Sequence, residues 1–503
     1  MKDGKKSYKA KVLLINPPLI DFKVTRNIYY PIGLLSIATL LVKNNIKAEL
    51  LDANLLATNM KVTEDALATY IITVCFDKIR NLNPCVIGIG GLFSGSFVAV
   101  KTIARLIKQN FPQIPIVIGG IHPTMFYREI LSTYKFIDYV IIGEGEYSFL
   151  ELVLHLMDRR SVNNVGRLAY RNGNENENEV SANPTTNFID NLDDLPDIDY
   201  NIVDTKDYKE DTSDWYSPKK LNIGFPFPIL LSRSCPNQCN FCSMWMVHGK
   251  KIRFRSPERV VDEITRLYCT YGMRQIDFMD DNLTFSKERI LKICEGIVER
   301  NLNIQFATPN GVSIKTLDKE IIDAMVEAGL FRVGLAIESG SEYIRNTVMR
   351  KGLKTEKIYE VVELAAKHKH LFLNGYFMIG MPQETHETLE DTYTMIKALP
   401  LDMYGISFAT PYPGTELYYY CLKHNLISHK GMLDDVNLQS IRDTPHFKPH
   451  ALEEQDLIDF RKKCLRELDE RRKNVPPNYP IRYAELHKCN LVYSKDGEKS
   501  IVM

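Results

Sequence analysis

Residues 228–242 read PILLSRSCPNQCNFC, an apolar strand pattern that runs directly into three cysteines, Cys235, Cys239 and Cys242. Thiolates are the usual ligands of iron–sulfur clusters, and one short loop can place three of them around a single [4Fe–4S] cluster. Three protein ligands leave one iron open to a small molecule, which indicates catalysis rather than electron transfer. The alternative is a zinc site with His248 as fourth ligand, although the paired Cys-x-x-Cys halves typical of zinc sites are missing.

The strand before the cysteines is the first of six predicted strands that are separated by helical patterns. They lie at approximately 228–234, 275–279, 304–307, 331–337, 372–379 and 404–409. Six βα units are two fewer than a complete eight-stranded barrel, so we expect an open, partial (β/α)6 barrel of the TIM type. In such barrels the functional side chains gather at the carboxyl ends of the strands, where the cysteines begin.

A separate α/β pattern precedes this barrel. Short apolar strands are predicted at 11–16, 48–51, 86–90, 116–118 and 138–142, with helical patterns such as 33–43 and 98–110 between them. This alternation predicts an N-terminal doubly wound, Rossmann-like domain with a parallel sheet and helices on both faces. Glycines follow several strand ends, at the edge where such sheets bind ligands. A dinucleotide is disfavoured, because no G-x-G-x-x-G follows the first strand.

The pattern divides the chain into four parts. We expect a doubly wound domain over residues 1–155, a linker over 156–215, the barrel over 216–430 and a C-terminal substrate-side region over 431–503. The predicted linker contains Asn172-Gly173, a hairpin signal. The C-terminal region is predicted to be small and mostly helical, with a helix around 453–472.

Composition narrows the class of protein. The 503 residues carry 63 basic and 63 acidic side chains, so the formal net charge is zero, which argues against a nucleic-acid-coating protein. No apolar stretch is long enough for a membrane helix, and the charged first residues do not form a signal peptide. Ten cysteines are too sparse for a disulfide scaffold. We therefore expect a cytoplasmic enzyme in a reducing compartment.

The cysteine motif, with Phe241 before the last cysteine, resembles the radical S-adenosylmethionine superfamily, and the resemblance implies that Phe241 contacts the cofactors. There the open iron binds the amino and carboxylate groups of S-adenosylmethionine, and the reduced cluster cleaves it to a 5′-deoxyadenosyl radical. At later strand ends the resemblance implies S-adenosylmethionine contacts from Asp280, Asp281, Asn282, Glu338, Ser339 and Gly380. The Asp-Asp-Asn form, in place of the usual Gly-Gly-Glu, is similar to the subgroup that also binds cobalamin.

The N-terminal domain looks like the cobalamin-binding domain of that subgroup. The resemblance places around this cofactor Pro31, Gly33, Gly90, Ser94, Gly119, Gly120, His122, Thr124, Gly143, Glu144 and Gly145. The Asp-x-His-x-x-Gly motif, by which other cobalamin proteins supply an axial histidine, is absent, and the context of His122 does not match it. The resemblance therefore implies a base-off cobalamin without a protein imidazole on cobalt. A scaffold that has lost its cofactor is the alternative.

The resemblance covers roughly residues 10–155 and 225–420 and implies a cobalamin-dependent radical methyltransferase. The substrate would be a small biosynthetic intermediate, methylated at an unactivated carbon. Such a carbon is neither acidic nor nucleophilic, so polar catalysis cannot methylate it. A ring closure, ring contraction or oxidation would use the same cofactors, and a non-catalytic cobalamin-binding module is a third possibility. The expected enzyme is oxygen-sensitive and monomeric, and takes electrons from a donor such as flavodoxin or ferredoxin.

Overall fold

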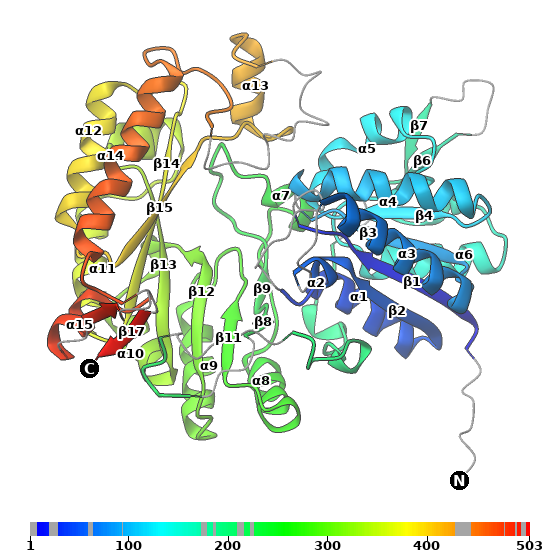
Figure 1. The fold of residues 1–503 in the computed structure, drawn as a ribbon, viewed down its shortest axis with the longest axis horizontal. Helices are drawn as coiled ribbons and strands as arrows, with labels where there is room; N and C mark the ends of the chain where they lie inside the picture. Colours follow the sequence, from blue (N-terminus) through cyan, green and yellow to red (C-terminus); the bar gives the residue numbers. More distant parts are fainter. Residues whose placement is uncertain are drawn as a thin grey trace. The chain divides into compact units, whose positions relative to one another are not determined.

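The computed structural model describes residues 8–19, 29–58, 64–92, 94–172, 179–184, 188–208, 216–221, 226–427, 444–476, 478–487, 490–493 and 499–502. These residues form two compact units, each with its own sheet (Figure 1). The N-terminal unit contains the described residues up to 208 together with 243–249. The C-terminal unit contains residues 216–242 and the described residues from 250 onward.

The N-terminal sheet has seven strands in the order β2-β1-β3-β4-β5-β6-β7. The first five in sequence run parallel, namely β1 (Ala10–Asn16), β2 (Ile46–Asp52), β3 (Val86–Gly90), β4 (Ile116–Gly119) and β5 (Tyr139–Ile141). The predicted doubly wound domain is confirmed. Its strand order 2-1-3-4-5 reverses between β1 and β3, and ligands bind at the carboxyl ends of the strands beside such a switch point.

Helices cover both faces of this sheet. As a result the middle of β1, residues 12–15, is fully buried on both sides. One apolar core joins α1 (Ile32–Lys43) and α6 (Glu146–Met157) to Val12, Leu14 and Val86 of the strands. The other described helices of this unit are α2 (Ala53–Thr58), α3 (Glu64–Leu82), η1 (Ser94–Ser96), α4 (Phe97–Asn110), α5 (Ile121–Thr133), η2 (Val162–Asn164), η3 (Leu192–Asp194), η4 (Tyr200–Ile202) and α7 (Met244–His248). Of these, α7 follows the cysteines in sequence and packs on α5.

The predicted linker is largely part of the N-terminal unit. The strands β6 (Leu168–Arg171) and β7 (Val180–Ala182) are antiparallel and extend the sheet beyond β5. Further along, the Tyr208 hydroxyl donates to Asp52 Oδ2 at 2.7 Å, and its ring stacks on Tyr30 at 4.3 Å. The predicted hairpin signal is followed by an antiparallel pair of strands, β6 and β7, although Gly173 itself lies outside the described residues. The strands β6 and β7 are only 4 and 3 residues long, too short to give a clear strand pattern in the sequence, which explains the different boundary.

The C-terminal sheet has six parallel strands in the order β15-β14-β13-β12-β11-β8, so the partial barrel is confirmed. They are β8 (Phe227–Ile229), β11 (Gln275–Phe278), β12 (Gln305–Val312), β13 (Leu330–Glu338), β14 (Phe372–Ile379) and β15 (Met403–Phe408). The helices between strands are α8 (Pro257–Tyr271), α9 (Lys287–Glu299), α10 (Lys319–Ala328), α11 (Thr355–Ala366) and α12 (His386–Ala398). No helix in the described part of the chain is both long and apolar enough to cross a membrane.

The first predicted barrel strand is split in two. Residues Ser232–Arg233 form β9, which pairs with β10 (Arg253–Phe254) in a separate ribbon. The break lies at Leu231, whose backbone N–H donates to both carboxylate oxygens of Asp280 at 3.1 Å. The carboxylate of Asp280 thus accepts the hydrogen bond that a carbonyl of a neighbouring strand would otherwise accept from Leu231.

Two helices of the predicted C-terminal region contact the edge strand β15 and the residue that precedes it. The helix α14 (Glu454–Arg472) runs antiparallel to the edge strand β15 (Figure 1). Near its end, Arg472 donates to the Asp402 carbonyl at 2.7 Å, and in its middle Arg461 donates to the Ile406 carbonyl at 3.2 Å. The next helix, α15 (Ile481–His487), lies at the amino ends of the strands, where Arg482 pairs with Asp402 at 3.0 Å. Leu457 of α14 lies beside Gly380 at the carboxyl edge, whereas α15 lies at the amino ends, and the substrate-side role of residues 431–503 stays a prediction.

Two further elements complete the C-terminal unit. The helix α13 (Glu416–Lys423) and Phe447 share an apolar cluster with Met381 and Ala409 at the carboxyl edge of the barrel. The strands β16 (Asn490–Tyr493) and β17 (Lys499–Val502) form an antiparallel ribbon.

Candidate functional site

The cysteine loop, residues 234–243, is held at its start and closed at its end by hydrogen bonds. Ser234 has a left-handed backbone (φ 80°), and its N–H donates to Asp281 Oδ2 at 3.0 Å. At the far end the Cys242 N–H donates to the Cys239 carbonyl at 3.2 Å, which makes a tight turn. All three cysteines are half-buried. Within the described ranges the structure shows no group of three His, Cys, Asp or Glu side chains that could hold a metal ion.

The three polar residues after β11 have different surroundings. Asp280 is 1% exposed and accepts the Ser232 hydroxyl at 2.5 Å as well as the Leu231 N–H, and burial raises the pKa of its carboxyl to about 7. Asp281 holds the start of the cysteine loop. Asn282 places its Nδ2 3.5 Å from Cys235 Sγ, and its buried Oδ1 has no partner in the described structure. Of the three predicted S-adenosylmethionine contacts, Asn282 offers an unused acceptor beside a cysteine, whereas both aspartates bind protein backbone.

At the end of β13 a glutamate and a lysine form a shielded ion pair. Glu338 has a left-handed backbone (φ 73°) and lies 2.5 Å from Lys351 Nζ, with side-chain exposures of 12% and 10%. Burial raises the pKa of the Cys239 thiol, and the cation of Lys351 opposes this effect. Lys351 was not predicted, since a single lysine in a helical pattern carries no sequence signal.

Ser339, the other residue predicted at this strand end, faces the protein interior. It is fully buried, its hydroxyl lies 3.3 Å from Thr392 Oγ1, and it accepts the Ser341 N–H at 3.2 Å. These contacts fix the loop between β13 and the next helix. Ser339, predicted as an S-adenosylmethionine contact, therefore binds protein groups in this structure.

The turn after β14 is organised by a buried carboxylate. Gly380 has φ 89° and donates its N–H to Glu384, which also accepts the Met381 N–H at 3.1 Å. Burial raises the pKa of Glu384 to about 7. Phe241 of the cysteine loop packs on the apolar cluster that contains Met381. The predicted role of Phe241 as a cofactor contact thus coexists with a packing role that ties the loop to this turn.

In the N-terminal unit, the glycines after β3 and β4 pack against each other. The Gly91 N–H donates to the Gly119 carbonyl at 2.6 Å. Gly120 has φ 116°, and a Cβ there would lie 2.7 Å from the Gly91 carbonyl oxygen. These glycines, which the resemblance placed around the cofactor, therefore allow the turn after β3 to pack closely against the turn after β4.

The histidine of this edge is enclosed. His122 is 1% exposed and lies between the rings of Phe97 and Phe126, at centroid distances of 4.2 and 4.7 Å. Its Nδ1 is 3.1 Å from Ser94 Oγ. The imidazole is therefore packed in the protein interior, and the expected absence of a protein imidazole on cobalt stays a prediction.

The other predicted residues of this edge mainly support its loops. Thr124 Oγ1 accepts the Gly143 N–H at 2.9 Å, and Glu144 accepts the Ile189 N–H at 3.1 Å. Pro31 and Gly145 stand immediately before α1 and α6, and Gly90 ends β3.

Part of the same edge is open. A Cβ on Gly33 would meet no atom within 4 Å, and the side chains of Leu92 and Tyr29 are 54% and 52% exposed. An apolar, uncrowded edge beside the switch point of the sheet fits a large, flat macrocycle such as a corrin.

Comparison with known families gives two matches. The profile of the radical SAM superfamily matches residues 229–396, and that of the B12 binding domain matches residues 19–153.

Individual proteins agree with both. The chain is 30% identical over 440 residues to the uncharacterized methyltransferase PH0819 of Pyrococcus horikoshii, covering 87% of this chain and 88% of that protein. It is 27% identical over 405 residues to the anaerobic magnesium-protoporphyrin IX monomethyl ester cyclase of Cereibacter sphaeroides, covering 78% and 61%. The structure of the methyltransferase TsrM from Kitasatospora setae, with cobalamin and a [4Fe–4S] cluster bound, has a TM-score of 0.69 at 16% identity and coverages of 92% and 90%, which is a likeness of fold.

Proposed function

The chain belongs to the radical S-adenosylmethionine superfamily and carries a B12-binding domain, and from this premise we propose that it is a C-methyltransferase for an unactivated carbon of a small biosynthetic intermediate. Its cofactors are a [4Fe–4S] cluster, S-adenosylmethionine and cobalamin. The observation that carries the proposal is the 30% identity, over most of both chains, to a protein named as a methyltransferase.

The donor sets of the C-terminal unit suit the first two cofactors. When bound, the cluster supplies one-electron cleavage of S-adenosylmethionine, and cobalamin supplies the methyl group for transfer. Cys235, Cys239 and Cys242 would hold the cluster. The unused Oδ1 of Asn282, beside Cys235, would accept a hydrogen bond from the amino group of S-adenosylmethionine. Glu338, at the end of β13, would accept hydrogen bonds from the ribose hydroxyls.

The carboxyl edge of the N-terminal sheet suits cobalamin. Leu92 and Tyr29 offer exposed apolar surface, and Gly33 leaves the start of α1 uncrowded. Because His122 is enclosed by two phenylalanine rings, we propose that cobalt receives no imidazole from this edge.

The second candidate is a radical reaction without methyl transfer. It is favoured by the 27% identity to a cyclase, although the chain spans only 61% of that protein's length. We also propose a small-molecule substrate, a flavodoxin- or ferredoxin-like electron donor, a monomeric state and a cytoplasmic location, which would keep an oxygen-labile cluster reduced.

One experiment separates these candidates without knowledge of the substrate. The chain is reconstituted anaerobically with iron, sulfide and hydroxocobalamin, reduced with titanium(III) citrate and given S-adenosylmethionine alone. A methyltransferase should form S-adenosylhomocysteine in an amount close to the bound cobalt. The Cys239→Ala variant should form as much of it but no 5′-deoxyadenosine.

Other outcomes would contradict the proposal. Deoxyadenosine without S-adenosylhomocysteine, in protein that contains cobalt, would favour the cyclase-like reaction. Neither product would indicate a non-catalytic binding module.

A further inference from the structure

An unusual helix follows the end of β13. Residues Tyr343–Val348 form the π-helix η6, in which the Met349 N–H donates to the Ile344 carbonyl at 2.8 Å. A turn later the Lys351 N–H donates to the Arg345 carbonyl at 2.9 Å. Widened turns of this kind are rare in proteins overall, but those that do occur are often found at functional sites. None of the roles assigned above uses this helix.

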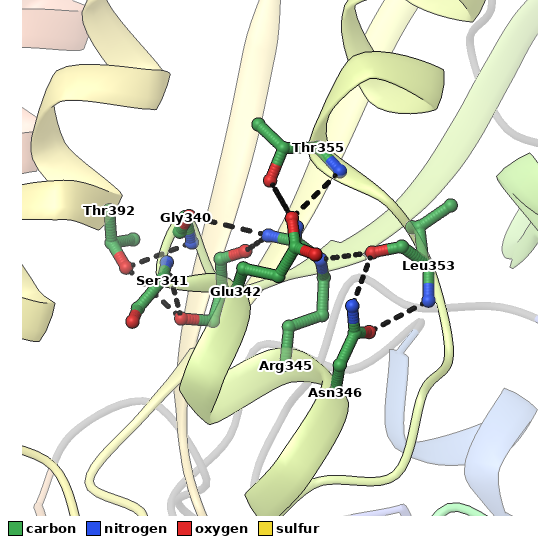
Figure 2. A network of polar contacts seen from close by, with 9 residues as sticks. Gly340, Ser341, Glu342, Arg345, Asn346, Leu353, Thr355 and Thr392 are labelled. Carbon is green, nitrogen blue, oxygen red and sulfur yellow. Dashed lines mark hydrogen bonds and ion pairs between the residues drawn. The ribbon is translucent and has the colours of Figure 1, made fainter.

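A fully buried arginine of η6, Arg345, binds the segments that precede and follow this helix (Figure 2). The Arg345 side chain is 0% exposed, and its guanidinium donates to the Ser339 carbonyl at 2.6 Å and to the Leu353 carbonyl at 2.8 Å. It also donates to Thr355 Oγ1 at 2.6 Å and lies 3.4 Å from a carboxylate oxygen of Glu342. One side chain thereby joins the end of β13 to the start of α11, with η6 held in between.

Burying a guanidinium costs free energy unless acceptors satisfy its N–H donors, and here the surrounding carbonyls, Thr355 and Glu342 provide those acceptors. Burial lowers the pKa of Arg345, and the carboxylate of Glu342 counters this. Arginine suits the position because its planar fork can bond several acceptors at once, whereas a lysine cannot span them.

The far end of η6 carries the cysteine loop. Asn240, between Cys239 and Phe241, donates its backbone N–H to the Met349 carbonyl at 3.2 Å and its Nδ2 to the Val348 carbonyl at 2.7 Å. Its own carbonyl accepts the Leu417 N–H at 3.0 Å, at the start of α13. The middle of the cysteine loop is therefore attached to the same helix whose base Arg345 fixes.

We propose that Arg345 and Asn240 are positioning residues that set the cysteine loop at a fixed spacing from Glu338 before S-adenosylmethionine binds. Two attachments connect the sites. Arg345 binds η6 to the carbonyl of Ser339, the residue after Glu338, and Asn240 binds the cysteine loop to the end of η6. Displacements of about 1 Å in such frames cost a large part of binding and rate. The inference rests on the cysteine loop holding the cluster and is independent of methyl transfer.

The variants are Arg345→Met, Arg345→Lys and Asn240→Ala, and the matched control is Arg482→Met. Arg482 is also a largely enclosed arginine of the C-terminal unit, with its side chain 12% exposed and bonds to the carbonyls of Leu371 at 2.8 Å and Pro400 at 2.7 Å, but it lies at the amino ends of the strands. Each full-length protein is reconstituted anaerobically. Iron per chain, the electron paramagnetic resonance spectrum of the reduced cluster, and the spectral titration with S-adenosylmethionine are then measured.

Arg345→Met and Asn240→Ala should retain iron but raise the apparent Kd for S-adenosylmethionine at least tenfold, with a broadened spectrum. Arg345→Lys should lie between these and the wild type. Arg482→Met should melt at a lower temperature, yet keep the wild-type spectrum and a Kd within twofold.

The proposal is overturned if Arg345→Met keeps the wild-type spectrum and Kd, or if Arg482→Met alters both as strongly. Should Arg345→Met fail to fold, Asn240→Ala decides the question, since it removes a single side-chain donor and a wild-type Kd there would overturn the proposal. Because no readout depends on methyl transfer, loss of the methyltransferase assignment would leave these outcomes unchanged.

Discussion

Replacing Gly120 by alanine should destabilise the N-terminal unit by about 2–6 kcal/mol. The backbone of Gly120 (φ 116°, ψ −170°) lies in a region that is almost confined to glycine and costs other residues about 1–3 kcal/mol. The new Cβ would also lie 2.7 Å from the backbone carbon and oxygen of Gly91, and such overpacking costs a further ~1–3 kcal/mol because backbone cannot swing aside.

Gly33→Ala is the matched control. No atom lies within 4 Å of a Cβ at Gly33, which stands in the first turn of α1, so alanine should leave the cofactor-free unit unchanged or stabilise it by up to ~1 kcal/mol. If Gly33 borders the corrin, this variant should nevertheless bind hydroxocobalamin more weakly. The two glycines then separate folding from cofactor binding.

Thermal unfolding of the cofactor-free chain, with amide hydrogen exchange in β3 and β4 to identify the unit that melts, measures the first effect. Absorbance titration with hydroxocobalamin measures the second. Gly120→Ala should lower the melting temperature of the unit by at least about 5 °C. Wild-type melting and exchange in Gly120→Ala would refute the account of the paired turns given above.

Further predictions concern the C-terminal unit. Cys239→Ala should lose the cluster while still binding cobalamin, measured as iron and cobalt per chain, and a normal iron content would remove Cys239 from the site. Arg482→Met should destabilise this unit by about 3–5 kcal/mol, because Asp402 (0% exposed) would lose its cation; Asp402→Asn in the same chain should restore part of the loss, and an effect below ~1 kcal/mol would contradict this. Burial raises the pKa of Glu384 from 4.5 to about 7, so the folded state holds its proton more tightly, and stability should fall by ~3 kcal/mol as the pH rises between these values and then level off. Glu384→Gln should remove this slope from urea unfolding curves, and an unchanged slope would show that the carboxyl titrates normally.

Local patterns were sufficient to predict the two sheets. Fully apolar strands such as 12–15, followed by helices with one apolar face, specify parallel βα units without knowledge of distant partners. The cysteine loop was found for the same reason, since all three thiols lie within one short segment. The place of Asn282 near the cysteines came from the family resemblance, and the structure puts this residue in the loop after the neighbouring strand β11.

Features that depend on distant contacts were missed. Arg345 lies in a polar-looking helical segment, and nothing in its neighbours indicates that the side chain is fully buried. The position of α15 follows from the pair between Arg482 and Asp402, which are 80 residues apart. Asp280 and Ser339 were correctly placed at strand ends, but the sequence could not show that their oxygens bind protein rather than face a ligand.

The covering of β15 by α14 bears on how the chain folds during synthesis. Arg461 of α14 donates to the Ile406 carbonyl on the outer edge of β15, and the Tyr404 hydroxyl donates to the Cys464 carbonyl at 2.6 Å. Because translation proceeds from the N-terminus, β15 leaves the ribosome well before α14 and spends that interval as an unprotected edge, open to pairing with other nascent chains. Slow translation between these two segments would therefore lengthen the aggregation-prone stage, and chaperone dependence should concentrate there.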